Sequence, residues 1–406
     1  MNLTGAYCPR RRPNAAHSPN GQFAAVAPEF AVIELRGMKY RRMPIEIESP
    51  EQMGYDRIKY NLTESSCADL AVNDLRLDLQ GLLVAYCDHR GKTELRELLA
   101  QDSGLASRDQ VLITPGAAGA LFIVATTLLG TDDHILVVRP NYATNLETPR
   151  AIGCHVDIYD LKFEEGFDID PIRVEAMLHP RTKYISITIP ANPTGVVLSE
   201  IRLRQLITLA EGRGIKLLVD ETYREMAFAG ALPVAASLSQ AAISVSSLSK
   251  TYGLPGLRIG WIATRDPALQ ESFLAAKEQI VICNSVVDEE IAWKFLRRKA
   301  ELLPGIRREI AERFAIVRNW YVPQEELEWV EPQGGVVAFP RIKPELRIDL
   351  DRFYRTLQEQ YGTFVGPGHW FEMDRRFMRV GFGWPTRPEL TAGLQAITAA
   401  ARSART

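Results

Sequence analysis

Residues 247–261 read SLSKTYGLPGLRIGW and place a lysine, Lys250, directly after an apolar-alternating run. The run from Ile243 to Leu248 predicts a buried strand, so the lysine amine lies at a strand end. Serine hydroxyls precede the lysine, and Arg258 follows it. A lysine amine in such a place can form a Schiff base with a carbonyl compound. A serine three residues before a lysine is a weak signal by itself, because an exposed lysine at a strand end is the simpler interpretation.

An alternation of strands and helices surrounds this stretch. From about residue 110, short apolar runs typical of buried strands alternate with helical patterns. The expected strands are 111–114, 134–139, 154–161, 183–189, 216–220, 243–249 and 259–264, and the expected helices are 117–129, 170–179 and 199–214. This alternation predicts an α/β fold with a mostly parallel sheet covered by helices, and ligands beyond the carboxyl ends of the strands.

The pattern changes after the last of these strands. A long charged helical stretch covers 266–321, with interruptions expected near Asn284 and Pro304. Beyond it, the chain predicts strands at 327–330, 336–340 and 377–382 and helices at 349–360 and 387–402. We therefore expect a smaller α+β domain built from both chain ends.

Four segments follow from these patterns. Residues 1–42 are rich in Pro, Arg and small polar residues, which predicts a disordered tail or a mis-called start. Residues 43–85 are expected to pack with the small domain. Residues 86–322 form the large domain, and residues 323–406 form the small C-terminal domain.

The composition excludes several classes of function. Of the 406 residues, 46% are apolar, which is enough for a sizeable core, and the net charge is −2. A nearly neutral chain argues against nucleic acid or a membrane surface as the main partner. The 5 cysteines are scattered, and no C-x-x-C or H-E-x-x-H pattern occurs, so we expect neither a disulfide framework nor a metal. A cytoplasmic setting is the default for such a chain.

Small residues and an aromatic residue follow the first two strands of the large domain. Gly116, Ala117 and Ala118 open a helix directly after a strand, where backbone N–H groups can approach a phosphate. Tyr142 follows the next strand and can stack on an aromatic ring. Ordinary packing explains each feature equally well when it is taken alone.

Four polar residues are more specific. Asn192 lies in the turn PANPTG, which projects its amide from a strand end. Asp220 ends a hydrophobic strand, where an unpaired carboxylate would be costly and a protonated pyridine nitrogen would satisfy it. Tyr223 follows closely enough to reach a hydroxyl on the same ring. Arg379, in an expected strand with apolar neighbours, can hold a carboxylate through two parallel hydrogen bonds.

Taken together and in this order, these residues resemble the fold-type-I pyridoxal-phosphate enzymes, specifically the class I/II aminotransferases. The resemblance covers about residues 45–400 and is carried by ANPTG at 191–195, DETY at 220–223 and the block from Ser247 to Arg258. It implies pyridoxal 5′-phosphate as the cofactor and Lys250 as its Schiff-base lysine.

The resemblance also implies roles for the other candidates. Asp220 would pair with the pyridine nitrogen, Asn192 and Tyr223 would address the ring hydroxyl, and Tyr142 would stack on the ring. The implied phosphate contacts are the backbone of Gly116, Ala117 and Ala118 and the side chains of Ser247, Ser249 and Arg258. Arg379 and Asn192 would bind the substrate, with Arg379 holding its α-carboxylate.

The segment YCDHRGKTELR at 86–96 resembles a family segment whose tyrosine reaches the phosphate of the partner subunit. Tyr86 would have that role, which implies a homodimer with shared active sites. The implied reaction is the transfer of an amino group between an L-amino acid and a 2-oxo acid in a ping-pong cycle.

Two departures concern the substrate. Many relatives carry a Gly-Glu-Pro-Asp-like motif where this chain has YNLTESSC at 60–67. Dicarboxylate-specific relatives carry a distal arginine, whereas residues 282–287 read ICNSVV, which argues against aspartate as the preferred donor. Trp370, Phe371, His89 and Glu64 are the candidates for lining the substrate pocket.

A second reaction stays open. The stretch GGVVAFPR at 334–341, together with YGLPGLR at 252–258, also resembles capreomycidine-synthase-like enzymes. The resemblance implies the same fold and cofactor, but a different outcome, in which a hydroxylated arginine derivative undergoes elimination and cyclisation.

Overall fold

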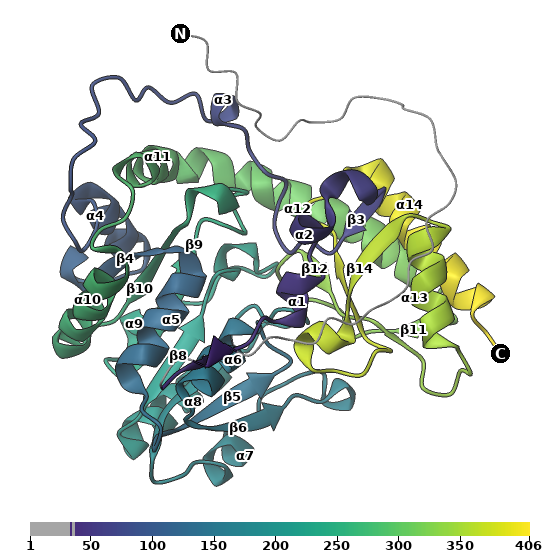
Figure 1. Ribbon diagram of the computed structural model, residues 1–406, viewed down its shortest axis with the longest axis horizontal. Helices are drawn as coiled ribbons and strands as arrows, with labels where there is room; N and C mark the ends of the chain where they lie inside the picture. The colour runs from purple at the N-terminus through teal and green to yellow at the C-terminus, as the bar shows by residue number, and fades with distance from the viewer. Residues whose placement is uncertain (1–32, 35–36) are drawn as a thin grey trace.

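Seven strands of nearly continuous apolar residues form the larger sheet of the computed structural model, which describes residues 33–34 and 37–406 (Figure 1). In sheet order they are β4 (Val111–Pro115), β10 (Ile259–Ala263), β9 (Ala242–Ser247), β8 (Lys216–Asp220), β7 (Thr182–Thr188), β5 (His134–Arg139) and β6 (His155–Asp160). Strands β9, β8, β7, β5 and β6 are parallel, and β10 runs antiparallel to both of its neighbours. This arrangement confirms the expected mostly parallel sheet.

Helices cover both faces of this sheet, because successive strand residues point to opposite sides. In β8, Leu218 packs with the helices α5 (Gly116–Leu128) and α6 (Thr144–Ile152). Its neighbours Leu217 and Val219 point to the other face and pack with α8 (Glu200–Arg213). The remaining helices of this layer are α4 (Thr93–Asp102), α7 (Pro171–Ala176), α9 (Ala235–Leu238), α10 (Pro267–Val281) and α11 (Val286–Leu296).

Local signals in the sequence explain the helix ends. The hydroxyl of Ser199 accepts a hydrogen bond from the backbone N–H of Arg202 and caps the start of α8. Gly214, in the left-handed conformation, ends the same helix. Asp266 caps α10 in the same way as Ser199 caps α8, with Pro267 in the first turn.

One expectation about the long helical stretch is wrong. The break near Asn284 is present between α10 and α11, but Pro304 lies inside α12 (Lys299–Tyr321), and the second break falls at residues 297–298. A proline removes one backbone donor from a helix. The packing of α12 against α14 (Arg387–Ser403), with Ile310 and Val317 buried, offsets that loss.

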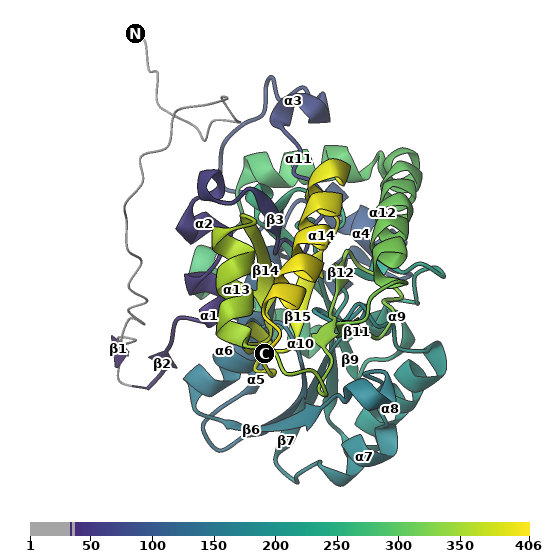
Figure 2. The same ribbon diagram turned by 90° about the vertical axis from the view of Figure 1, so that its right-hand side faces the viewer.

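The smaller sheet joins the two ends of the chain, as the sequence predicts. Its order is β12 (Val337–Ala338), β15 (Met378–Gly381), β14 (Thr363–Pro367) and β3 (Tyr60–Leu62), and β3 pairs with β14 in parallel. The helices α13 (Leu350–Glu359) and α14 pack on it (Figure 2). A separate two-stranded antiparallel sheet consists of β11 (Leu327–Glu328) and β13 (Arg341–Ile342).

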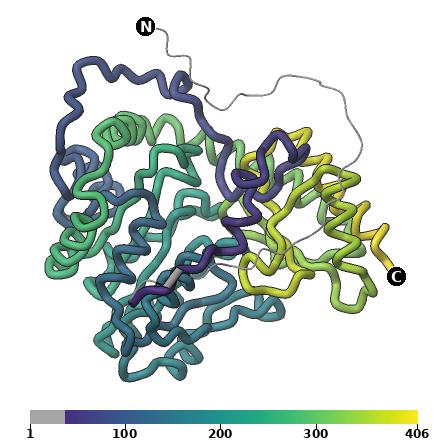
Figure 3. The backbone as a smooth tube through the Cα atoms, viewed as in Figure 1, coloured from purple at the N-terminus to yellow at the C-terminus, as the bar shows by residue number. Residues whose placement is uncertain are grey.

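The N-terminal segment connects the two parts (Figure 3). The expected tail of residues 1–42 lies mostly outside the described residues, although β1 (Ile33–Glu34) pairs with β2 (Lys39–Tyr40) next to α6. From there the chain passes through α1 (Pro44–Ile47) and α2 (Pro50–Met53) to β3, and then through α3 (Val72–Leu75) back to α4. No helix in the described part of the chain is long and apolar enough to cross a bilayer.

Candidate active site

The polar residues expected from the sequence gather at the carboxyl ends of the parallel strands. Asp220 is the last residue of β8, and parallel pairing aligns it with Thr188 of β7 and Val245 of β9. Lys250 follows β9, and Asn192 follows β7. Neighbouring parallel strands end at the same edge of a sheet, which is where ligands bind in folds of this type.

Asp220 is a buried carboxylate that faces the lysine. Its Oδ1 atom accepts hydrogen bonds from the backbone N–H of Thr222 at 3.0 Å and from the Thr222 hydroxyl at 2.6 Å. Burial raises the pKa of Asp220, and the hydrogen bonds and the positive charge of Lys250 oppose that shift. Lys250 is the cation of the described chain whose charge acts on this carboxyl, so a second cation would be stabilised there.

Lys250 is half-buried against the N-terminal segment. Its backbone carbonyl accepts a hydrogen bond from the N–H of Cys67 at 3.0 Å, and the carbonyl of Gly253 accepts one from Leu70 at 3.0 Å. Gly253 has φ +62°, and a side chain there would collide with the carbonyl of Ala68. The chain that follows β3 therefore lies directly on the loop that carries the lysine.

A cradle for an anion lies at the N-terminus of α5. Antiparallel pairing of β10 with β4 brings Arg258 next to Gly116, whose φ is +74°. A Cβ atom on Gly116 would collide with the Arg258 guanidinium, and one on Gly260 would lie 2.5 Å from the carbonyl carbon of Gly116 and 2.7 Å from the nitrogen of Ala117. Exposed N–H groups at a helix start and an arginine favour a phosphate.

Other expected phosphate contacts surround this cradle. Ala118 lies in the first turn of α5, next to Ala117. Ser247 ends β9 and is buried, and its hydroxyl accepts a hydrogen bond from the N–H of Ser249 at 3.3 Å. The loop between β9 and Lys250 therefore turns both serines inward.

Arg379 is a buried guanidinium without an acidic partner at ion-pair distance in the described chain, and it is 4% exposed. Its Nη1 donates to Oδ1 of Asn192 at 3.1 Å, and its Nη2 donates to the carbonyl of Thr63 at 2.6 Å. Its Nε lacks a hydrogen-bond partner, and the guanidinium lies 5.1 Å from the ring centre of Phe371. Burial lowers the pKa of Arg379, so an anionic ligand would stabilise its charge.

Two tyrosines complete the centre. Tyr223 is buried near Ser65, and within the described residues its hydroxyl makes no hydrogen bond of good geometry. Burial raises the pKa of Tyr223 to about 12, and the charge of Arg379 opposes the shift. Tyr142 is half-buried; burial raises the pKa of its hydroxyl, and the charges of Lys250 and Asp220 both act on it. Both tyrosines therefore lie with the lysine and the aspartate.

Sequence reasoning missed Asn141. It is buried, and its Oδ1 accepts hydrogen bonds from the N–H of Tyr142 at 2.7 Å, from Nδ2 of Asn145 at 3.2 Å and from the hydroxyl of Thr188 at 2.8 Å. Its Nδ2 donor has no partner in the described chain. A polar residue directly after Pro140 at the end of an apolar strand was the signal that pointed to it.

Of the residues expected to line the substrate pocket, three lie near Arg379 and one lies away from it. Phe371 lies against Arg379, and Glu64 is acted on by the charges of both Lys250 and Arg379. Trp370 lies beside Phe371, where its ring N–H donates to Glu48 at 2.6 Å. His89 contacts Glu278 of α10 at 2.6 Å, so this protomer does not bring it to the lysine.

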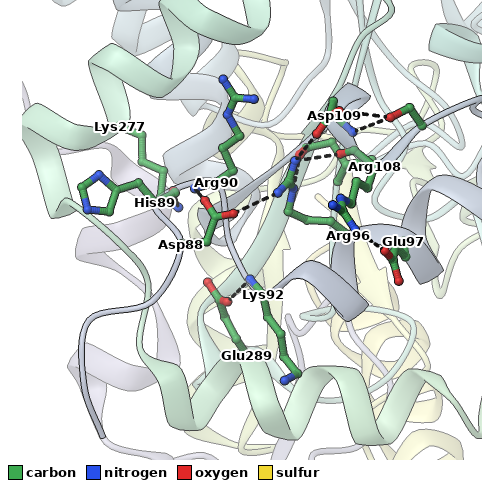
Figure 4. A network of polar contacts seen from close by, with 12 residues as sticks. Asp88, His89, Arg90, Lys92, Arg96, Glu97, Arg108, Asp109, Lys277 and Glu289 are labelled. Atoms are coloured by element: carbon green, nitrogen blue, oxygen red, sulfur yellow. Dashed lines mark hydrogen bonds and ion pairs between the residues drawn. The ribbon is translucent and has the colours of Figure 1, made fainter.

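Tyr86 also lies apart from the centre of its own protomer, at 83% exposure. The residues after it are firmly anchored, as Figure 4 shows: the buried Arg96 contacts Asp88 and Asp109, and Lys277 donates to the carbonyl of His89. The structure therefore holds the base of this segment while Tyr86 projects outward.

The chain matches the family model described as "Aminotransferase class I and II" over residues 58–397. It belongs to the class I and II aminotransferases. Capreomycidine synthase from Streptomyces vinaceus is 30% identical over 345 residues, which are 84% of this chain and 86% of that protein. An arginine–pyruvate transaminase from Pseudomonas aeruginosa is 28% identical over 298 residues, 70% of this chain and 74% of its own length.

Solved structures agree with this assignment. A PLP-dependent aminotransferase from Streptococcus suis superposes with a TM-score of 0.83 at 26% identity, over 89% of this aminotransferase and 98% of that chain. The PLP-dependent cyclase OrfR superposes with a TM-score of 0.78 at 26% identity, over 87% and 96%. This aminotransferase is therefore an enzyme that uses pyridoxal phosphate.

The residues present fit that cofactor. The cradle of Gly116, Gly260 and Arg258 has the charge and the backbone approach that a phosphate requires. Among the described residues, Lys250 is the cation whose charge acts on the buried Asp220, and the Tyr223 hydroxyl makes no hydrogen bond of good geometry. A protonated ring nitrogen and a ring hydroxyl would satisfy these two groups.

Proposed function

We propose that this aminotransferase transfers an amino group between an L-amino acid and a 2-oxo acid, with Lys250 as the residue that holds the cofactor covalently and moves the proton. The observation that carries the proposal is that a buried carboxylate, Asp220, lies at the same strand edge as Lys250 and within reach of its charge. An unneutralised carboxylate at that depth needs a cationic ligand.

Each residue then has a defined task in the reaction. Pyridoxal phosphate, when bound, supplies an aldehyde and an electron-withdrawing ring. Asp220 keeps the ring nitrogen protonated, and Tyr223 and Nδ2 of Asn192 hydrogen-bond the ring hydroxyl. The neutral amine of Lys250 takes the proton from the substrate Cα.

Arg379 is the residue that fixes the substrate. Its guanidinium is held by Asn192 and by the carbonyl of Thr63, and its Nε remains to be paired. A substrate α-carboxylate bound there would be oriented by two or more charge-assisted hydrogen bonds. This orientation selects the Cα–H bond as the one that breaks.

We further propose a homodimer that works in the cytoplasm. Tyr86 is 83% exposed, and Leu83 and Val84 in the same loop are 78% and 77% exposed. The loop between α3 and α4 runs along the outside of the molecule, beyond α11 (Figure 1). Contiguous exposed apolar residues favour an interface, here with a second copy whose site would receive Tyr86. The free cysteines Cys67, Cys87, Cys154 and Cys283 are consistent with a reducing compartment.

The variant Lys250→Ala tests the role of the lysine. We expect turnover to fall at least about a thousand-fold, because the proton carrier is lost. Borohydride treatment followed by intact-mass measurement should add the mass of the cofactor to the native enzyme and not to the variant. Lys183→Ala, which removes an exposed lysine paired with Asp133 of the described chain, is the matched control. Normal turnover by Lys250→Ala would refute the assignment.

Elimination with cyclisation is the second candidate reaction. The similarity to capreomycidine synthase and to the cyclase OrfR favours it. Assaying 2-oxo acid and ammonia together over a panel of amino acids separates the two reactions. Stoichiometric 2-oxo acid without ammonia supports transamination, whereas a cyclised product supports the second reaction.

A further inference from the structure

We propose that the amino donor carries a positively charged side chain, and that Glu64 is the residue that recognises it. The inference rests on the proposed function, because it concerns the substrate that lies between Lys250 and Arg379. It names a class of donor, namely amino acids that end in a guanidinium or an ammonium group.

Glu64 has no cationic partner at ion-pair distance in the described chain. Its Oε1 accepts hydrogen bonds from the hydroxyl of Tyr55 at 3.2 Å and from Nδ2 of Asn61 at 3.4 Å, and both donors are neutral. The residue is partly exposed, and no arginine or lysine of the described chain lies at ion-pair distance from it. The carboxylate is thus held in place without being neutralised.

The carboxylate belongs to the pocket that contains the reacting groups. Burial raises the pKa of Glu64, and the charges of Lys250 and Arg379 both oppose that shift. The residue before Glu64, Thr63, accepts a hydrogen bond from Arg379 at 2.6 Å. One short stretch of chain therefore touches the guanidinium and presents a carboxylate beside it.

A second observation points to a ligand in this pocket. Arg379 is buried, and its Nε has no hydrogen-bond partner among the described residues, so the pocket can bind an anion as well as a cation. An amino acid with a cationic side chain supplies both charges, with its α-carboxylate on Arg379 and its distal group on Glu64. A neutral donor would leave the carboxylate of Glu64 desolvated and unpaired, which is unfavourable.

The backbone fixes how Glu64 lies relative to Arg379. Both residues belong to the small sheet, since Glu64 follows β3 and Arg379 lies in β15. A side chain at Gly381 would collide with the carbonyl of Glu64, and one at Gly383 would lie 2.5 Å from the carbonyl of Ser66. These glycines let the backbone of the 64–66 stretch lie directly on the strand of the arginine.

Other carboxylates add negative charge near the pocket that contains Glu64. Glu46 of α1 has its pKa raised by burial and by Glu51, and the charges of Lys250 and Arg379 lower it. Glu51 of α2 also raises the pKa of Glu64. A donor with a second carboxylate would meet this field and be repelled.

Wild-type holoenzyme with a set of donors provides the first test. The half-reaction is followed for L-arginine, for its neutral analogue L-citrulline, for L-lysine, for L-norleucine and for L-glutamate. We expect kcat/KM for arginine to exceed that for citrulline by about 10- to 100-fold, the range for one charge-assisted hydrogen bond. The kcat/KM for lysine should likewise exceed that for norleucine, and glutamate should have the lowest kcat/KM of the set.

The variant Glu64→Gln keeps the shape of the side chain and removes its charge. The variant should raise the KM for arginine about 10-fold or more. It should change the KM for citrulline less than about 3-fold. Tyr55→Phe, which removes a hydrogen bond but keeps the carboxylate, should retain the preference for arginine. The control variant Glu359→Gln, at an exposed site on α13, should have the same KM for arginine and for citrulline as the native enzyme.

The outcomes separate this inference from the function on which it rests. Equal use of arginine and citrulline by the native enzyme, or an equal loss for both in Glu64→Gln, would overturn the role of Glu64 and leave aminotransfer intact. No conversion of any donor would overturn the proposed function itself. The wild-type comparison needs no variant, so misfolding of Glu64→Gln would not rescue the inference.

Discussion

Asp220 and Glu221 are adjacent buried carboxyl groups with different partners. Asp220 accepts hydrogen bonds from Thr222 and faces Lys250. Glu221 turns away, and its Oε1 accepts hydrogen bonds from the N–H of Ala235 at 2.7 Å and the hydroxyl of Ser244 at 3.0 Å. One carboxyl group is therefore suited to chemistry and the other to holding α9 on the sheet.

Replacing Asp220 tests the chemical role. Asp220→Asn keeps the hydrogen-bond acceptor for Thr222 and removes the charge that would keep a ring nitrogen protonated. We expect kcat to fall about 100-fold or more while the cofactor is retained. Steady-state kinetics and the visible absorbance of the cofactor measure the two quantities. An unchanged kcat would show that this carboxylate does not tune the ring.

Glu221 predicts a pH dependence of stability. Burial raises the pKa of Glu221 from 4.5 to about 7, so the folded protein holds this proton to a higher pH than the unfolded chain. The resulting stabilisation is complete below pH 4.5 and is lost as the pH rises through 7. Glu221→Gln keeps an acceptor without a charge, so its free energy of unfolding should exceed that of the native protein by about 1–3 kcal/mol at pH 8.

The same comparison at pH 4.5 serves as the control. There the native Glu221 is protonated, so the variant should gain little. Urea denaturation at both pH values measures the difference. An equal gain at both would mean that ionisation of Glu221 is not the cause.

At the scale of elements, the contact between β10 and the start of α5 shapes the phosphate cradle. Gly260 of β10 lies against the backbone of Gly116 and Ala117. This close approach fixes the direction in which α5 begins and the place where Arg258 meets Gly116. The cradle is thus a property of two elements together.

Gly260→Ala should disturb that contact. A Cβ atom would lie 2.5 Å from the Gly116 backbone, so β10 and α5 must separate. We expect the free energy of unfolding to fall by about 1–3 kcal/mol and the affinity for the cofactor to fall about 10-fold. Gly256→Ala, four residues earlier in the turn before β10 and with nothing within 4 Å of its Cβ position, is the matched control. Thermal unfolding and cofactor titration of both variants measure the effects.

The sequence predicted what depends on local patterns and strand order. The seven strands of the large sheet begin and end within two residues of their expected bounds. The positions of Lys250 and Asp220 after apolar strands were predictable, because the apolar periodicity shows clearly where those strands end. Glu64 was a candidate for the substrate pocket, but the parallel pairing of β3 with β14, which brings its segment to the strand next to that of Arg379, was not predictable from local patterns. The expected helix break at Pro304 was wrong because tertiary packing stabilises α12 across this residue, and no local sequence pattern records that packing.

At the scale of the whole molecule, the anchored base and exposed tip of the 83–86 loop imply sharing between two copies. If Tyr86 enters the site of the partner, each active site contains residues from both chains. A hybrid dimer of Lys250→Ala and Tyr86→Ala subunits then has one site with both defects and one site with neither.

Co-expression of the two variants checks this expectation. Each variant alone should be at least about 10-fold less active than the native enzyme. Random pairing makes half of the dimers hybrids, so the mixture should recover about a quarter of the native activity. A mixture that merely averages the two parents would mean that Tyr86 acts within its own chain or not at all.

The pairing of β3 with β14 also determines how long the chain must wait before it can fold completely. Tyr60 leaves the ribosome about 300 residues before Thr363, its neighbour in the sheet. At the usual pace of synthesis the interval is roughly 15–60 s. Throughout this interval, the strand that precedes Glu64 lacks the neighbour with which it pairs in the sheet, whereas the lysine loop that residues 67–70 cover is synthesised before the interval ends.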